Sequence, residues 1–301
     1  MAFVGTDSAG MQDIRGINVD KTLSGFALQE YIFKQICAIQ SSSKWEERYF
    51  QESSADLTGG TGSAVEGVPR LANFPHMETA WTRAESFHKK HGGETRISHE
   101  DIISNDVPTI ARSLLRLARA ITKSVDLDIW ETISESTSGS YPRTSATNTN
   151  VVTITAGHEW DSATIALQNP IQDILNAKKE IAVDNYNPDR EGYLLLSPKD
   201  YANLLGNANI RNAGQFYTDD VTRNGKVGFL LGLKVLVSNN VYTDYAMVCV
   251  GKECANWKSL QALTVVQIED AGIGTTIRAW EIGVCQLVNP EAVCIIANTQ
   301  A

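Results

Sequence analysis

The clearest pattern in the chain is a helical alternation of apolar and polar positions between residues 108 and 133. Asn105-Asp106-Val107-Pro108 opens this stretch, and a polar residue followed by an early proline is typical of a helix start. At about 1.5 Å per residue, a helix over 108–133 would be roughly 39 Å long. The pattern predicts one long amphipathic helix with a buried face. That face consists of Ile110, Leu114, Leu117, Ile121 and Val125.

The opposite face of the same helix carries a row of cations, Arg112, Arg116, Arg119 and Lys123, which we call the basic stripe. At roughly 100° per residue the basic stripe lies about 200° around the helix from the apolar positions. Four positive charges on one face can attract phosphate groups or pair with acidic groups of another subunit. A solvated helix face is the alternative interpretation.

Shorter patterns predict the remaining helices. Leu28, Tyr31, Ile32, Ile36 and Ile39 recur at helical spacing and predict an amphipathic helix over 25–43. A second helix is predicted to start at Asn169-Pro170. A third would start at Ser197-Pro198, where Ser197 can cap, and would end at Gly206.

Strand-like runs of apolar and β-branched residues fill much of the second half of the chain. Helices and strands do not alternate regularly, so the predicted fold class is α+β with mostly antiparallel strands. The predicted strands are 151–155, 192–196, 229–237, 245–250, 263–268, 276–288 and 292–297.

Residues 44–92 have another character. Two charged, aromatic-bearing arms, 45–50 and 80–96, flank a glycine-rich centre at 57–63. The centre has few side chains that could build a core of its own, so its order must come from packing on something else. We predict a long hairpin here. Residues 1–24 show neither helical nor strand period and are predicted to form an extended arm.

Composition limits the classes of protein that fit. The 301 residues are 43% hydrophobic and 20% charged, which excludes collagen-like, coiled-coil and wholly disordered proteins. The net charge of -9 opposes a surface that grips phosphate backbones everywhere, so any nucleic-acid contact must be local. No apolar run approaches the roughly 20 residues that span a bilayer, and no membrane partner is expected. The N-terminal residues lack a secretory signal pattern, so intracellular synthesis is expected.

No motif in the chain assembles a catalytic or metal site. The glycine-rich stretch 59–63 lacks the Lys-Ser/Thr ending of a phosphate loop, and neither a nucleophile elbow nor a zinc helix motif occurs. The number of cysteines is odd and their spacing is not that of a zinc site, so buried reduced thiols are expected. No catalytic residue, cofactor or metal is predicted. The cysteines are Cys37, Cys249, Cys254, Cys285 and Cys294.

Histidines offer the one functional alternative. Four of the five lie between residues 76 and 99, where a metal or catalytic cluster is conceivable. His88 and His91 belong to the polar run His88-Lys89-Lys90-His91-Gly92-Gly93, so we expect a solvated surface stretch.

Several segments in serial order resemble a known family. They are the arm, the hairpin, Ile97-Ser98-His99-Glu100-Asp101-Ile102-Ile103 before the long helix, the run 192–201, the run 228–238 and Val288-Asn289-Pro290-Glu291-Ala292-Val293. Over residues 25–298 this order resembles the Hong Kong-type phage capsid fold of tailed-virus major capsid proteins, which encapsulin shells share.

The resemblance implies a division of the chain into the parts of that fold. These parts are the N-terminal arm 1–24, the amphipathic helix 25–43, the extended loop 44–92, the peripheral domain 93–160 and 255–285 with the spine helix 108–133, and the axial domain 161–254 and 286–301.

The resemblance also implies sites. The extended loop would lie on a neighbouring subunit, and the basic stripe would face packaged double-stranded DNA. The implied contacts of the extended loop are Trp45, Arg48, Tyr49, Arg70 and Trp81. The implied residues of the capsomer-axis loop, 207–224, are Asn207, Arg211, Asp219 and Asp220.

The function that the resemblance implies is that of a non-enzymatic capsid protein of the virion, assembled in the host cytoplasm. Its partners would be further copies of itself in pentamers and hexamers, weakly and non-specifically bound DNA, and separate scaffold, portal and decoration proteins. Some relatives cross-link through a lysine on the extended loop. Residues 51–82 contain no lysine, so no cross-linked shell is expected. Because the chain starts at Met1 and reaches the arm at once, a separate scaffold or none is expected.

Two alternatives remain. The first is an encapsulin shell around a cargo enzyme, although encapsulins typically begin with a helix where this chain has an unpatterned arm. The second and more distant alternative is a hydrolase or metal enzyme that uses the histidine-rich segment 88–99.

Overall fold

A computed structural model describes residues 31–52, 68–74, 82–100, 107–136, 149–207, 210, 228–270 and 272–301. The predicted arm 1–24 and the glycine-rich centre 57–63 lie outside these residues. The described chain forms two compact units, which we describe one at a time. The first unit contains Tyr31, 88–126 and 259–283. The second unit contains 32–87, 127–258 and 284–301.

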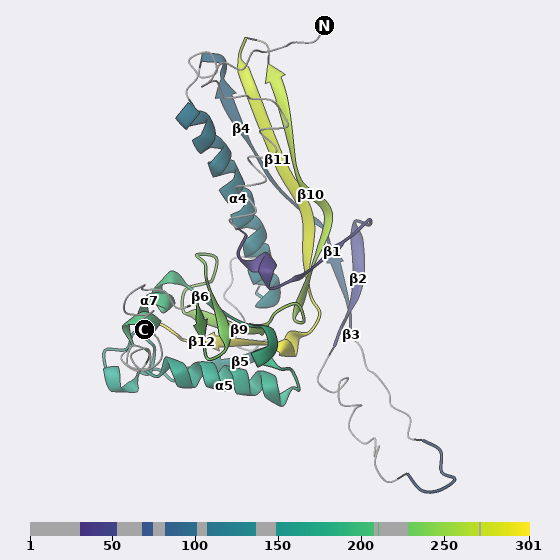
Figure 1. The fold of residues 1–301 in the computed structure, drawn as a ribbon, viewed down its shortest axis with the longest axis vertical. Helices are drawn as coiled ribbons and strands as arrows, with labels where there is room; N and C mark the ends of the chain where they lie inside the picture. The colour runs from purple at the N-terminus through teal and green to yellow at the C-terminus, as the bar shows by residue number, and fades with distance from the viewer. Residues whose placement is uncertain are drawn as a thin grey trace. The chain divides into compact units, whose positions relative to one another are not determined.

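The first unit contains most of the long helix α4 (Val107–Ile133), which confirms the helix predicted over 108–133. Three long strands accompany it, namely β4 (Lys89–Ser98), β10 (Ala255–Asp270) and β11 (Gly274–Leu287) (Figure 1). Within this unit β4 and β11 pair antiparallel, from Gly274 opposite Ser98 to Gly283 opposite Lys89. The predicted apolar face of α4 is buried at Leu114, Leu117, Ile121 and Val125.

Close approach of helix and sheet explains a glycine in β4. A Cβ atom at Gly93 would lie 3.0 Å from Cδ1 of Leu117, tighter than an ordinary van der Waals contact. The small residue thus lets α4 pack directly on the strand, and the buried face of the helix becomes the core of the first unit.

The second unit contains a six-stranded sheet in the order β5-β12-β9-β6-β8-β7. The pairs β5/β12 and β6/β8 are parallel and the others are antiparallel. Every residue of β9 and β12 is buried, so these strands form the centre of the core. The strands of this six-stranded sheet are β5 (Asn150–Thr153), β6 (Gly192–Leu196), β7 (Phe229–Leu230), β8 (Leu233–Val237), β9 (Tyr245–Val250) and β12 (Val293–Ala297).

Helix α5 (Pro170–Val183) packs along this sheet beside β5 and β12 (Figure 1). It begins after Asn169-Pro170 as predicted, although the Asn169 side chain makes no capping bond. Helix α7 (Pro198–Gly206) has the predicted cap, because Oγ of Ser197 accepts a hydrogen bond from the Asp200 backbone N–H at 3.1 Å. The remaining short helices are η2 (Ile165–Leu167), α6 (Pro188–Glu191) and η3 (Pro290–Ala292).

The predicted helix over 25–43 is wrong where the structure describes it. A single 3-10 turn, η1 (Phe33–Gln35), is followed by the strand β1 (Ala38–Ser41), which pairs with β10. Phe33 is buried against Trp130, with ring centroids 6.2 Å apart, whereas Ile39 is 66% exposed. The apolar positions therefore do not share one helix face, and pairing with a distant strand overrides a weak helical period.

The predicted single strand 229–237 is also wrong, because a tight turn divides it into β7 and β8. Leu231 and Gly232 have φ angles of 52° and 81°, and Phe229 pairs back with Lys234. Two consecutive residues with positive φ are typical of a two-residue hairpin turn, for which glycine is favoured.

The first predicted arm, 45–50, is confirmed as a strand, but the second arm, 80–96, is confirmed only over 82–87, because residues 89–96 belong to β4 and pair with β11 instead. Strand β2 (Glu46–Gln51) pairs antiparallel with β3 (Thr82–Phe87), from Glu46 opposite Phe87 to Gln51 opposite Thr82. The other predicted strands are confirmed with end shifts of a few residues, and the mixed α+β fold class is confirmed with them. The strand predicted at 263–268 is part of β10, which begins well before residue 263.

All five cysteines have free, buried thiols, as expected. Burial raises the pKa of Cys294 to about 12, so its thiol stays protonated and unreactive near neutral pH. Among the residues that the structure describes, no helix is both long and apolar enough to cross a bilayer.

Candidate assembly surfaces

The β2/β3 hairpin has two different faces because successive strand residues point to opposite sides. On the outer face the cross-strand pairs are Glu46–Phe87, Arg48–Glu85 and Phe50–Arg83. Phe50 and Phe87 are 51% and 55% exposed, and Trp45 just before β2 is 55% exposed. Three large aromatic side chains are thus about half exposed in a segment rich in charged residues, and exposed apolar patches of this kind mark interaction surfaces. We call Trp45, Phe50 and Phe87 the hairpin aromatic surface.

The inner face of the hairpin binds its own subunit. Nε2 of Gln286 donates to Oγ of Ser86 at 2.7 Å, and Nε2 of Gln51 donates to the Leu287 carbonyl at 3.1 Å. The backbone N–H of Glu52 donates to the Val288 carbonyl at 3.0 Å. These bonds fix the base of the hairpin and therefore the direction of its outer face.

The predicted contact residues divide between these faces. Arg48 lies on the outer face, with Nε 3.1 Å from Oε1 of Glu85. Tyr49 lies on the inner face, where burial raises the pKa of its hydroxyl and the Cys285 thiol adds to the shift. Arg70 is exposed, in a segment with exposed Leu71 and Phe74. Trp81 lies outside the described residues.

Sequence reasoning missed Phe50 and Phe87. Each occupies a position that alternates with a half-buried or buried residue of its own strand, Tyr49 and Ser86. Strand alternation would have placed these phenylalanines on the face opposite Tyr49 and identified them as exposed aromatics.

The basic stripe lies as predicted. Arg112, Arg116, Arg119 and Lys123 are all exposed on α4, opposite the buried apolar face. They follow the helix over about three turns within the first unit. This arrangement puts four cations within reach of one extended polyanion.

The predicted capsomer-axis residues are only partly described. Asn207 is buried, and its backbone N–H donates to the Leu204 carbonyl at the end of α7. It therefore closes a helix rather than presenting a side chain to solvent. Arg211, Asp219 and Asp220 lie outside the described residues.

The expectation of a solvated histidine stretch is wrong for His88 and His91, both of which are buried. His91 lies on the helix-facing side of β4, and its Nδ1 is 2.9 Å from Oγ of Ser124 on α4. Lys89 and Lys90 remain exposed, because a strand sends neighbouring residues to different environments. Across the described ranges, no three His, Cys, Asp or Glu side chains form a group that could hold a metal ion.

Comparisons with known proteins agree with this architecture. The family model described as phage capsid protein matches residues 84–296, more than two thirds of the chain. A search of curated proteins finds no significant match. Among solved structures, a phage-related protein from Bordetella bronchiseptica RB50 is 12% identical with a TM-score of 0.64, covering 97% of this chain and 98% of that chain.

Two further structures have capsid or particle descriptions. A virus-like particle from Pyrococcus furiosus is 11% identical with a TM-score of 0.61, over 93% of this chain and 98% of that chain. The capsid of the cyanophage P-SCSP1u is 15% identical with a TM-score of 0.59, over 98% and 92%.

The fold is therefore the Hong Kong-type fold of viral capsid proteins. The chain belongs to the phage capsid protein family and is a structural protein of the capsid shell.

Proposed function

We propose that this protein is a major capsid protein whose copies form pentamers and hexamers and close into an icosahedral shell around double-stranded DNA. The observation that carries the proposal is the two-faced hairpin. Its inner face is bonded to its own subunit through Gln51, Ser86 and Gln286. Its outer face leaves Phe50 and Phe87 about half exposed, and Trp45 just before β2 is exposed to the same extent. A rigidly anchored, apolar surface of this kind suits repeated contacts between identical subunits.

The parts of the fold are assigned within the same proposal. Residues 93–160 and 255–285 form the peripheral domain, and 161–254 and 286–301 form the axial domain. The arm 1–24 and the extended loop 44–92 reach neighbouring subunits. Assembly takes place in the host cytoplasm, with scaffold, portal and decoration proteins as further partners.

The experiment that tests self-assembly is the particle mass of the purified full chain. Light scattering should detect particles of many subunits, and negative-stain microscopy should show closed shells or rings of five and six. A chain that remains monomeric or dimeric at high concentration, with and without crowding agents, would contradict the proposal. Shells that enclose protein cargo instead of DNA would contradict the proposed packaging of double-stranded DNA and would favour the encapsulin alternative.

The basic stripe is proposed to face the packaged DNA. Reversing two charges, Arg116→Glu with Arg119→Glu, should weaken binding of the subunit to duplex DNA. Each lost phosphate contact lowers the slope of log affinity against log salt by about 0.9, so the slope should fall by about 2. Titrations at several salt concentrations measure this slope, and nuclease-protected DNA in purified particles measures packaging.

A matched control reverses two exposed cations of the second unit, Lys179→Glu with Arg190→Glu. Both double variants change the net charge by the same amount, so a general effect of charge would appear in both. Equal DNA binding by the stripe variant and the wild type would remove the basic stripe from the proposal, while leaving self-assembly intact.

A further inference from the structure

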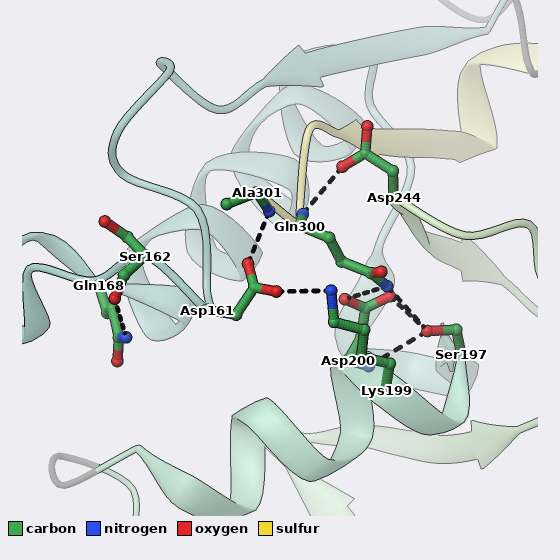
Figure 2. Close-up of polar contacts among 9 residues, drawn as sticks. All are labelled: Asp161, Ser162, Gln168, Ser197, Lys199, Asp200, Asp244, Gln300 and Ala301. Atoms are coloured by element: carbon green, nitrogen blue, oxygen red, sulfur yellow. Dashed lines mark hydrogen bonds and ion pairs between the residues drawn. The ribbon is translucent and has the colours of Figure 1, made fainter.

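Residues 298–301, which follow β12, are held by separate segments of the second unit (Figure 2). The backbone N–H groups of Asn298 and Thr299 donate to the Asp244 carbonyl at 3.0 and 3.3 Å. The Trp160 N–H donates to the Thr299 carbonyl at 3.0 Å. The N–H of Gln300 donates to Oδ1 of Asp244 at 2.8 Å. The backbone here is therefore fixed on both sides.

The side chain of Gln300 reaches the start of α7. Its Nε2 lies 3.0 Å from Oδ1 of Asp200 and 3.2 Å from Oγ of Ser197 (Figure 2). The Ser197 hydroxyl itself donates to Oδ2 of Asp200 at 2.7 Å while capping the helix. An amide from far along the chain thus completes the polar network at the N-terminus of α7.

Asp200 makes this network sensitive to charge. Its side chain is fully buried, and burial raises the pKa of its carboxyl even though Ser197 and Gln300 donate hydrogen bonds to it. Asp244 raises this pKa further through charge repulsion. A second negative charge placed at the Gln300 amide would meet a buried carboxylate with no new cation to compensate it.

A second contact holds the same turn of α7. Nζ of Lys199 lies 2.6 Å from Oδ2 of Asp161, and the Ala301 N–H donates to Oδ1 of Asp161 at 2.7 Å. Burial alone would raise the pKa of Asp161, but hydrogen bonds from Lys199 and Ala301 lower it below its usual range. Asp161 therefore remains ionised and links residue 301 to the first turn of α7.

Helix α7 ends at Gly206 and leads directly into 207–224, the segment assigned to the capsomer axis. Ser197 alone already caps the helix, so the bonds from Gln300 add orientation rather than a missing cap. We propose that Gln300 is a positioning residue for assembly, which fixes α7 through Ser197 and Asp200 and so sets the root of the loop at which subunits of one capsomer meet. This inference rests on the proposed capsid function.

The test replaces Gln300 by glutamate in the full chain. Gln300→Glu should raise the protein concentration needed for half-maximal shell assembly roughly tenfold, because like charges displace α7. Adding Asp200→Asn should restore assembly, because the new amide can donate to the new carboxylate. Gln172→Glu is the matched control, since Gln172 is exposed on α5 and its side-chain amide donates to Oδ1 of Asn176 on the same helix.

Folding is measured beside assembly. Hydrogen exchange should rise in α7 (198–206) of Gln300→Glu and remain unchanged in β9 and β12. If this variant fails to fold, Gln300→Ala replaces it, which leaves the Ser197 cap in place and should still impair assembly. Wild-type levels of assembly by Gln300→Glu, or no rescue by Asp200→Asn, would overturn the positioning role. Failure of the wild type to assemble would instead overturn the proposed function.

Discussion

Replacing Trp45, Phe50 and Phe87 together with serine is expected to abolish shell assembly at concentrations where the wild type assembles. Fully burying an exposed aromatic side chain contributes about 1.5–3 kcal/mol, so covering the exposed half of each one contributes roughly half of that, and each 1.4 kcal/mol changes an equilibrium constant about tenfold. Loss of all three from one interface should therefore weaken it by about two to three orders of magnitude. Because a shell repeats each interface many times, the effect on assembly is amplified.

The same substitutions should leave the isolated subunit stable. All three side chains are about half exposed and lie outside the buried core, so serine should lower the stability of the subunit far less than it weakens the interface. Sedimentation measures the fraction in particles, and thermal unfolding measures stability. The control is Ile165→Ser, Leu175→Ser and Val183→Ser, an equal number of exposed apolar residues on η2 and α5. Normal assembly of the hairpin variant would show that its outer face is not an interface.

Gly192→Val is expected to have the largest effect on stability. Gly192 begins β6, and a Cβ atom there would lie 2.2 Å from the Pro188 carbonyl oxygen and 2.3 Å from Cδ2 of Leu233. The first of these is a backbone atom within a short turn, so it cannot move without shifting α6 against β6. The cost should be at least about 3 kcal/mol, the upper end of overpacking effects.

Chemical denaturation of the purified subunit measures this cost, and few or no particles should form. Gly206→Ala serves as the control, because among the described residues no atom beyond its chain neighbours and the backbone of its own helix lies within 4 Å of the added Cβ. Its stability should stay within about 0.5 kcal/mol of the wild type. A Gly192→Val subunit as stable as the wild type would contradict the close contact between α6 and β6.

Glycine-sized contacts and anchored faces explain how a chain with low identity to other capsid proteins keeps their fold. The hairpin is held by the Gln286 side chain and the Leu287 carbonyl of β11, and α7 is held by Gln300, which follows β12. In both cases residues beyond position 285 hold a segment that lies earlier in the sequence. The side chains on these surfaces can vary in sequence while the hydrogen bonds keep the orientation of the hairpin and of α7. Repeated contacts between identical subunits require such a constant orientation.

Elements with a strong local pattern were predictable from the sequence. Leu114, Leu117, Ile121 and Val125 repeat at helical spacing over about three turns of α4, and Ser197-Pro198 carries its own capping signal. The basic stripe follows from the same helical geometry. In each case the determining residues lie within a few positions of one another, so neighbouring side chains suffice to define the structure.

Tertiary structure alone decided the remainder, because the determining partners are distant in sequence. Residues 38–41 became a strand by pairing with β10, against a weak helical pattern. His91 became buried because β4 directs it toward Ser124 of α4, although its neighbours are lysines. Gln300 lies within hydrogen-bond distance of Asp200 because it follows β12, which pairs with β9 in the sheet. Local periodicity defines an element and its faces, whereas strand register and long-range hydrogen bonds determine what each face meets.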